Sequence, residues 1–258
     1  MCTIYISMKE INFIPIFDQT APGVWDDFMR IRVAAMRENY GHDMSAADYA
    51  HYMRQYQDDF VRHQYNVAYG AYDDANMVGF IRGYAHGKTA QLECLYVLPD
   101  YQGNHIGKRL LRLAESSFAP VCSRAHLIAL GHTDKYYCTQ GYKTPTNTNM
   151  CEKKLQMPAC QKVAIFNYTP AIARLCRPII PADITDASAL IANHSPIWVD
   201  LDYQHTAKGI LVGKPDMSRP LFLYAPDDTP NQSTARSLQR FYDDYRKTIS
   251  IQHEKHQR

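Results

Sequence analysis

The segment Glu93–Leu111, ECLYVLPDYQGNHIGKRLL, places a strand-like run, a proline, a glycine-containing loop and an amphipathic helical pattern in succession. Its loop YQGNHIGK, at Tyr101–Lys108, is expected to expose backbone amides just before a helix that begins near Gly107. Free amide hydrogens at a helix N-terminus, together with the positive end of the helix dipole, attract anions. Small residues let phosphate oxygens approach the main chain, so the segment predicts an anion site that suits a pyrophosphate.

One alternative for this segment is the P-loop of nucleotide-binding proteins. That motif has four residues between its glycines and a Ser or Thr directly after its lysine. Here three residues separate Gly103 from Gly107, and Arg109 follows Lys108. The spacing therefore excludes a P-loop.

The loop instead resembles the acyl-CoA loop of the GNAT superfamily of N-acetyltransferases, whose pattern is Arg or Gln, two residues, Gly, any residue, then Gly or Ala. Gln102, Asn104, Ile106 and Gly107 fit this pattern. His105 stands where the family usually has glycine. If the backbone there is left-handed, a non-glycine side chain carries some strain.

A second motif lies downstream in GHTDKYYCTQGY, Gly131–Tyr142. It is similar to the last conserved helix of the same superfamily, in which an aromatic residue and a tyrosine precede a glycine–aromatic pair. Tyr136 and Tyr137, followed by Gly141 and Tyr142, match that order. The asparagine often found before this helix is not evident here, so the positioning of pantetheine is expected to differ.

The resemblance covers about residues 10–155 and implies an α/β (α+β) GNAT fold, with a mixed, mostly antiparallel central sheet flanked by helices. It implies acetyl-CoA as co-substrate. No metal is expected, because the sequence contains neither a CxxC nor an HExxH pattern. Main-chain groups of a splayed strand would pair with pantetheine and polarise the thioester carbonyl. The residues implied for binding the co-substrate are Leu95, Tyr96 and Val97 on that strand, and Gln102, Gly103, Asn104, His105, Ile106, Gly107 and Lys108 in the loop.

Acetyl transfer from a thioester needs a neutral amine, so a base must accept a proton from the incoming ammonium group. Glu93 is the first candidate, because it interrupts the apolar strand LECLYVL just before the carbonyl-polarising residues. A charge there is costly unless it is paired or wet. The structural alternative is an exposed Glu93 or one paired with an arginine; His86, His105 and His132 are weaker substitutes.

The resemblance implies that Tyr137 lies near the sulfur of CoA and donates a proton to the departing thiolate. The alternative is a packed tyrosine with a satisfied hydroxyl. The neighbouring Cys138 suggests a ping-pong mechanism through an acyl-cysteine, but no base is placed beside it by the sequence. Direct transfer from acetyl-CoA is therefore expected.

The elements that position these residues follow from periodicity. Helical spacing is predicted over Val24–Glu38 and again after Ser45, a plausible N-cap. Three strands then form an antiparallel meander, and a strand, helix and strand imply one parallel pair. The predicted strands are Glu10–Ile16, Asn66–Tyr72, Met77–His86, Thr89–Leu98 and His126–Leu130.

Two domains are expected in this chain of 258 residues: an acetyltransferase domain over residues 1–157 and an accessory α+β domain of unknown role over residues 158–258. In the last helix, apolar residues share a face that can pack on this module, on the first domain or on a second subunit of a homodimer; core packing is favoured. The predicted strands are Val163–Asn167, Ile197–Leu201 and Leu221–Tyr224, and the predicted helices are Asp183–Asn193 and Ser233–Ile249.

Composition limits the remaining classes. The net charge of +2 with no basic track predicts no nucleic-acid partner, and no apolar run reaches membrane-spanning length. Seven scattered cysteines without CxxC fit a reduced cytoplasmic protein. We expect an N-acetyltransferase acting on a small-molecule or peptide amine; a non-catalytic acyl-CoA-binding sensor or assembly module is the alternative.

Overall fold

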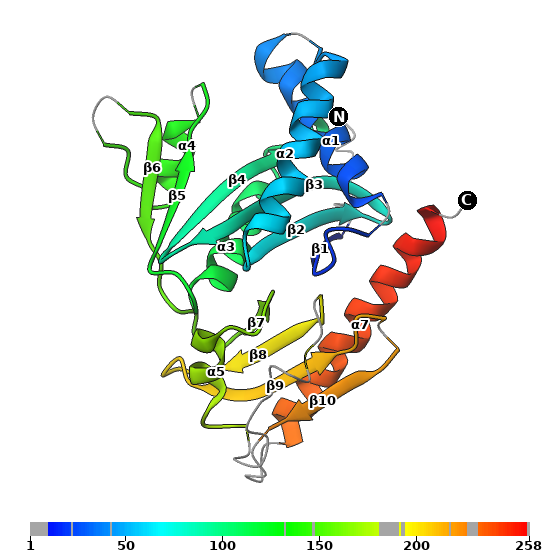
Figure 1. Ribbon diagram of the computed structural model, residues 1–258, viewed down its shortest axis with the longest axis vertical. Helices are drawn as coiled ribbons and strands as arrows, with labels where there is room; N and C mark the ends of the chain where they lie inside the picture. The colour runs from blue at the N-terminus through cyan, green and yellow to red at the C-terminus, as the bar shows by residue number, and fades with distance from the viewer. Residues whose placement is uncertain are drawn as a thin grey trace, which may run out of the picture.

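The computed structural model describes residues 10–21, 23–41, 43–131, 133–145, 148–180, 191, 194–216, 218–225 and 232–256. Its strands form two sheets, one of six strands and one of four, which lie one above the other in Figure 1. None of the described helices is long and apolar enough to cross a lipid bilayer.

The larger sheet follows chain order from β1 to β6. Every neighbouring pair is antiparallel except β4 and β5, which are parallel, so the predicted mixed, mostly antiparallel sheet is confirmed. β5 begins two residues before the predicted start at His126, because the buried Ala125 already belongs to the strand. The apolar run that suggested a later strand continues past Ile128, where β5 ends. The strands are β1 (Ile11–Pro15), β2 (Asn66–Asp73), β3 (Asn76–His86), β4 (Thr89–Val97), β5 (Arg124–Ile128) and β6 (Met150–Lys154).

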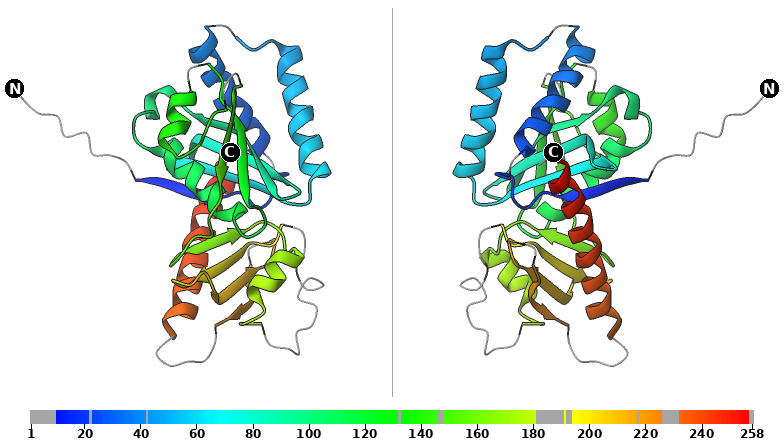
Figure 2. Two further views of the ribbon diagram at one scale, coloured as in Figure 1. Left: turned by 90° about the vertical axis from the view of Figure 1, so that its left-hand side faces the viewer. Right: turned by 90° about the vertical axis from the view of Figure 1, so that its right-hand side faces the viewer.

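Helices cover both faces of this sheet (Figure 2). On one face lie α1 (Val24–Tyr40) and α2 (Ala46–Arg62), and on the other lies α3 (Ile106–Phe118). The predicted N-cap of α2 is confirmed, since Ser45 Oγ accepts a hydrogen bond from the Asp48 amide at 3.1 Å. A short 3₁₀ turn, η1 (Pro99–Tyr101), leads from β4 into the loop before α3, and α4 (Asp134–Thr139) follows β5.

The C-terminal sheet is antiparallel throughout and has the order β10-β9-β8-β7. It is accompanied by α5 (Pro170–Cys176) and the long α7 (Gln232–His256), while most of the predicted helix at 183–193 lies outside the described residues. The strands are β7 (Lys162–Ile165), β8 (Ile197–Leu201), β9 (Ala207–Gly213) and β10 (Pro220–Tyr224). A division of the chain at residue 157 stays a prediction.

Strand β9 was not predicted, and its glycines show why. A Cβ at Gly213 would lie 2.6 Å from the Tyr242 ring of α7, and one at Gly209 would lie 2.9 Å from Thr234. Glycine weakens a strand pattern, but here it lets α7 pack directly on the sheet. Farther along α7, the buried Tyr245 donates a hydrogen bond to the Pro15 carbonyl at 3.3 Å, so this helix also contacts the end of β1.

Candidate functional site

The site begins where β4 and β5 separate. Their parallel ladder joins only Thr89–Gln91 to Arg124–His126, after which the two strands diverge, as Figure 1 shows. β5 therefore supplies no ladder partner to the second half of β4. Main-chain donors and acceptors of an unpaired strand edge are available to a ligand that can lie along it.

A β-bulge reshapes β4 at the same place. Phe80 pairs with Tyr96 and Arg82 with Glu93, so two residues of β4 oppose one residue of β3. One of the two, Cys94, has a left-handed backbone with φ of 53°. A bulge adds twist and redirects side chains next to many active sites. Here it turns Cys94 toward the helical layer above the sheet.

A cavity of about 290 Å³ occupies the opening between these strands. It contains four of the residues predicted from sequence, namely Glu93, Leu95, Tyr96 and Tyr137. The fold thus brings the predicted base and the predicted acid, which come from two separate motifs, to one cavity. Its other lining residues are Arg32, Tyr52, Gln55, Tyr56, Ile81, Gln91, Leu92, Cys94, Leu111, Leu127, Ile128 and Leu130.

Glu93 has the electrostatic properties of a base in this cavity. Burial raises the pKa of its carboxyl group, and the guanidinium of Arg82, directly across the ladder, opposes that rise. No hydrogen bond or ion pair joins Glu93 to another described side chain. The carboxylate is therefore free to accept a proton from a ligand.

Tyr137 projects from α4 into the same cavity and has the properties of a proton donor. Its hydroxyl makes no hydrogen bond within the described part of the chain, which disfavours the packed, satisfied tyrosine as an alternative. Burial raises the pKa of this phenol, with Tyr136 adding to the effect, so the group is protonated near neutral pH. The hydroxyl is available to donate to an atom inside the cavity.

The loop before α3 has the form of an anion site. His105 occupies the N-cap with a left-handed φ of 60°, and its side chain caps no amide. The first intrahelical bond runs from the Arg109 amide to the His105 carbonyl at 3.0 Å, so the amides of Ile106–Lys108 precede it. His105 therefore adopts the strained conformation for which the family pattern has glycine.

The loop side chains divide into two groups. Gln102 holds the loop itself: its amide donates to the Val97 carbonyl at 3.2 Å and to the Glu38 carboxylate at 3.0 Å. Gly103 has a φ of 77° and open space around its Cα, which fits a turn. A Cβ at Gly107 would lie 3.1 Å from the Tyr136 hydroxyl, so this position is close to α4.

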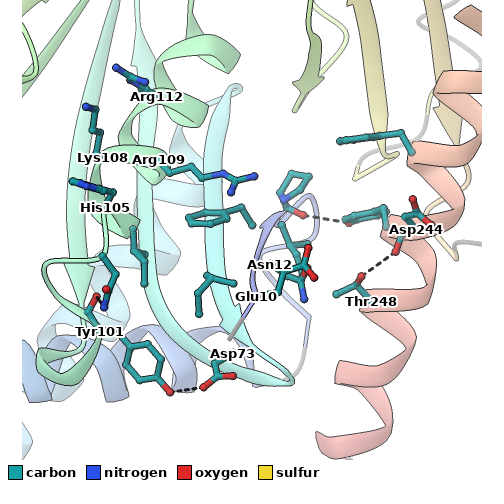
Figure 3. Close-up of a pocket in the computed structure, with 18 of the residues that line it drawn as sticks. Glu10, Asn12, Asp73, Tyr101, His105, Lys108, Arg109, Arg112, Asp244 and Thr248 are labelled. Atoms are coloured by element: carbon teal, nitrogen blue, oxygen red, sulfur yellow. Dashed lines mark hydrogen bonds between the residues drawn. The ribbon is translucent and has the colours of Figure 1, made fainter. Parts of the chain in front are cut away.

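The other four loop residues predicted to bind the co-substrate line a second, larger cavity of about 1270 Å³, together with Tyr101. Figure 3 shows it between the loop and α3 on one side and α7 on the other, with β1 at its floor. The loop residues concerned are Asn104, His105, Ile106 and Lys108. Arg109 also belongs to this cavity, with its guanidinium 4.3 Å from the centre of the Phe13 ring. The predicted co-substrate residues thus border two cavities rather than one.

The sequence did not predict that residues of α1 and α2 line the smaller cavity. Arg32 Nη1 donates to the Tyr56 hydroxyl at 2.5 Å and lies 3.5 Å from Cys94 Sγ, which is itself 2.9 Å from that hydroxyl. Nothing in the local pattern marks Arg32, because it lies on the same stripe of α1 as apolar core residues.

Among the described residues, no three His, Cys, Asp or Glu side chains gather as metal ligands would.

Residues 25–135 match the family model described as the acetyltransferase (GNAT) family. The match contains the divergent strand pair, the bulge and the loop before α3, but ends before Tyr137. Residues 25–135, which are less than half of the chain, are thus similar to the GNAT family of acetyltransferases.

Several solved structures are similar to this chain, and no curated protein sequence matches it. The PaiA N-acetyltransferase from Thermoplasma acidophilum, in complex with coenzyme A, is 21% identical with a TM-score of 0.45, over 56% of this chain and 99% of that one. A GNAT-family acetyltransferase from Staphylococcus aureus Mu50 is 12% identical with a TM-score of 0.47, over 57% and 100%. A GNAT-family acetyltransferase from Brucella melitensis, in complex with acetyl-CoA, is 17% identical with a TM-score of 0.44, over 63% and 98%.

Proposed function

We propose that this protein transfers an acetyl group from acetyl-CoA directly to a primary amine. The observation that carries the proposal is the meeting of Glu93 and Tyr137 in the cavity where β4 leaves β5. Neither side chain is bonded to another described residue, and their chemistry is complementary, one accepting a proton and one donating a proton.

The chain offers acetyl-CoA two kinds of group. The free amides of Ile106–Lys108 suit a pyrophosphate, since no side chain caps this end of α3. The β4 segment Leu95–Val97, which has no ladder partner on β5, suits the amide groups of pantetheine and can polarise the thioester carbonyl. Gln102 and Gly103 support the loop that connects these two regions.

In the transfer step, Glu93 accepts a proton from the incoming ammonium group and leaves a neutral amine. The amine nitrogen then forms a bond to the thioester carbonyl carbon, the nitrogen releases its second proton to water, and the bond between that carbon and sulfur breaks. Tyr137 protonates the departing thiolate, and its phenolate is reprotonated from solvent. Proton transfer by a positioned group contributes roughly 10² to 10⁴-fold to a rate.

The test is acetyl transfer to a panel of small amines and peptides, with CoA release followed by chromatography. We expect Glu93→Gln and Tyr137→Phe each to lower kcat by roughly 10² to 10⁴-fold while the Kd for CoA changes little. Tyr203→Phe is the matched control, because Tyr203 is 86% exposed and belongs to the C-terminal sheet region. Its kcat should equal that of the wild type.

Two results would contradict the proposal. Tight binding of CoA with no turnover on any amine would favour the non-catalytic acyl-CoA-binding sensor or assembly module. Full activity of Tyr137→Phe would remove the proposed acid, and the same result for Glu93→Gln would remove the proposed base.

We also propose that residues 158–258 form an accessory module appended to the acetyltransferase domain. Its support is the separate antiparallel sheet β7–β10 with α5 and α7. The apolar face of α7 packs mainly on this module, because Leu238 and Tyr242 are buried against β8 and β9. Self-association through that face is therefore not needed to cover it.

A further inference from the structure

Arg32 is a buried cation in the wall of the transfer cavity. Its side chain is only 8% exposed, and its guanidinium lies 3.6 Å from the centre of the Tyr52 ring. Nη1 is bonded to Tyr56 and Cys94, whereas Nε and Nη2 make no hydrogen bond within the described part of the chain. Nε is fully buried. Arg32 thus keeps a donor for a group inside the cavity.

A second guanidinium, that of Arg82, is 1% exposed and lies behind this wall, 4.5 Å from the centre of the Tyr56 ring. None of its nitrogens has a hydrogen-bond partner among the described residues. Glu93 is near enough to interact with its charge, yet it forms no ion pair with either arginine. Two buried cations thus have no contact with a described anion.

Buried charges are costly unless they are paired and hydrogen-bonded. The aromatic rings of Tyr52 and Tyr56 offset part of this cost for Arg32 through cation–π attraction. They do not supply an acceptor for its free N–H groups. When Glu93 turns toward a substrate ammonium group, the positive charge around Arg32 is compensated even less.

Arg32 and Glu93 line the same cavity, and their charges are near enough to interact. Arg32 Nη1 lies 3.5 Å from the sulfur of Cys94, the residue that directly follows Glu93. A volume of about 290 Å³ is at the lower end of the range for ligand pockets. It suits a compact acceptor rather than a long peptide.

We propose that the acceptor is a small amino acid, whose carboxylate binds Arg32 while its amino group faces Glu93. This inference rests on the proposed acetyl transfer at the same cavity. The carboxylate would accept a charge-assisted hydrogen bond from Nη2, and the two ends of the acceptor would meet opposite charges. Arg32 is then a residue that determines specificity.

Matched acceptors test this directly in the wild-type protein. Each amino acid is compared with its own primary amide, such as glycine with glycinamide, alanine with alaninamide and leucine with leucinamide. A charge-assisted hydrogen bond contributes about 1.5–3 kcal/mol, so kcat/KM for the acid should exceed that for the amide by about 10 to 100-fold. The amide has the less basic amine and therefore more of the reactive neutral form, so intrinsic reactivity favours the opposite order.

Arg32→Gln should bring the ratio of the two kcat/KM values close to one, while Arg37→Gln should leave that ratio unchanged. Arg37 is a matched control on the same helix, where its exposed side chain pairs with Asp43. If Arg32→Gln does not fold, the wild-type comparison still decides the question. A persistent preference for the acid in folded Arg32→Gln would overturn the role of Arg32.

Equal or faster turnover of the amides by the wild type would overturn the inference and leave acetyl transfer intact. If no amine is acetylated, the proposed function fails, and calorimetric titration of the CoA-loaded protein with glycine, alanine and leucine then tests the inference alone. Binding of an acid with at least tenfold preference over its amide would support it. Absence of that preference would overturn it.

Discussion

The left-handed backbone of His105, the N-cap of α3, provides a stability test of the anion loop. At this position a glycine variant should be more stable than an alanine variant, the reverse of the order inside a helix. A left-handed backbone costs a non-glycine residue about 1–2 kcal/mol, whereas glycine loses about 0.5–1 kcal/mol more conformational entropy on folding. His105→Gly should therefore be more stable than His105→Ala by about 0.5–1 kcal/mol. The His105 side chain is exposed and caps no amide, so both variants lose similarly little by its removal.

Arg112 is the matched control, because it is exposed and lies within the regular part of α3, where no residue has a left-handed backbone. At Arg112, Ala should be more stable than Gly by about 1 kcal/mol, the reverse of the order at His105.

Thermal unfolding measures both pairs. In a chain of this size 1 kcal/mol shifts Tm by about 2–4 °C, so the two His105 variants should differ by about 1–4 °C. If His105→Ala melts at or above His105→Gly, the loop does not hold the left-handed conformation, and the argument for free amides at this helix end loses its basis.

Two further predictions concern titration and thiol reactivity. Burial raises the pKa of Glu93, and only its deprotonated form accepts a proton. As the pH is lowered, kcat/KM should therefore fall with an apparent pKa above that of an ordinary glutamate, and the pH profile of Glu93→Gln should lack this fall. With iodoacetamide at pH 8, followed by peptide mass spectrometry, the exposed Cys138 and Cys160 should be alkylated well before Cys122 and Cys176, since burial raises the pKa of the last two to about 11 and about 12; equal labelling would contradict the buried positions.

Much of the sheet could be predicted because its strands and turns are local patterns. The predicted bounds of β2, β3 and β4 agree with the structure to within one residue, and the parallel partner β5 follows from the strand–helix–strand order. The loop at Tyr101–Lys108 could be predicted for the same reason, since its glycines and the α3 stripe are contiguous in sequence.

The rest depends on contacts that are distant in sequence. Arg32 meets Cys94 only because the bulge in β4 turns that residue toward α1, and the bulge contains no glycine to signal its left-handed backbone. β9 was not predicted because its glycines weaken the strand pattern. Their role is clear only from the packing of α7 against them. The large cavity beside α3 likewise needs α7, which lies more than a hundred residues away in the chain.

The most direct test of the central claim is a calorimetric titration of the purified protein with CoA and, separately, with pantetheine. If the amides before α3 bind the pyrophosphate, CoA should bind at one site per chain and at least about tenfold more tightly than pantetheine, which lacks that group. No affinity for CoA, or equal affinity for the two compounds, would contradict the account of this loop.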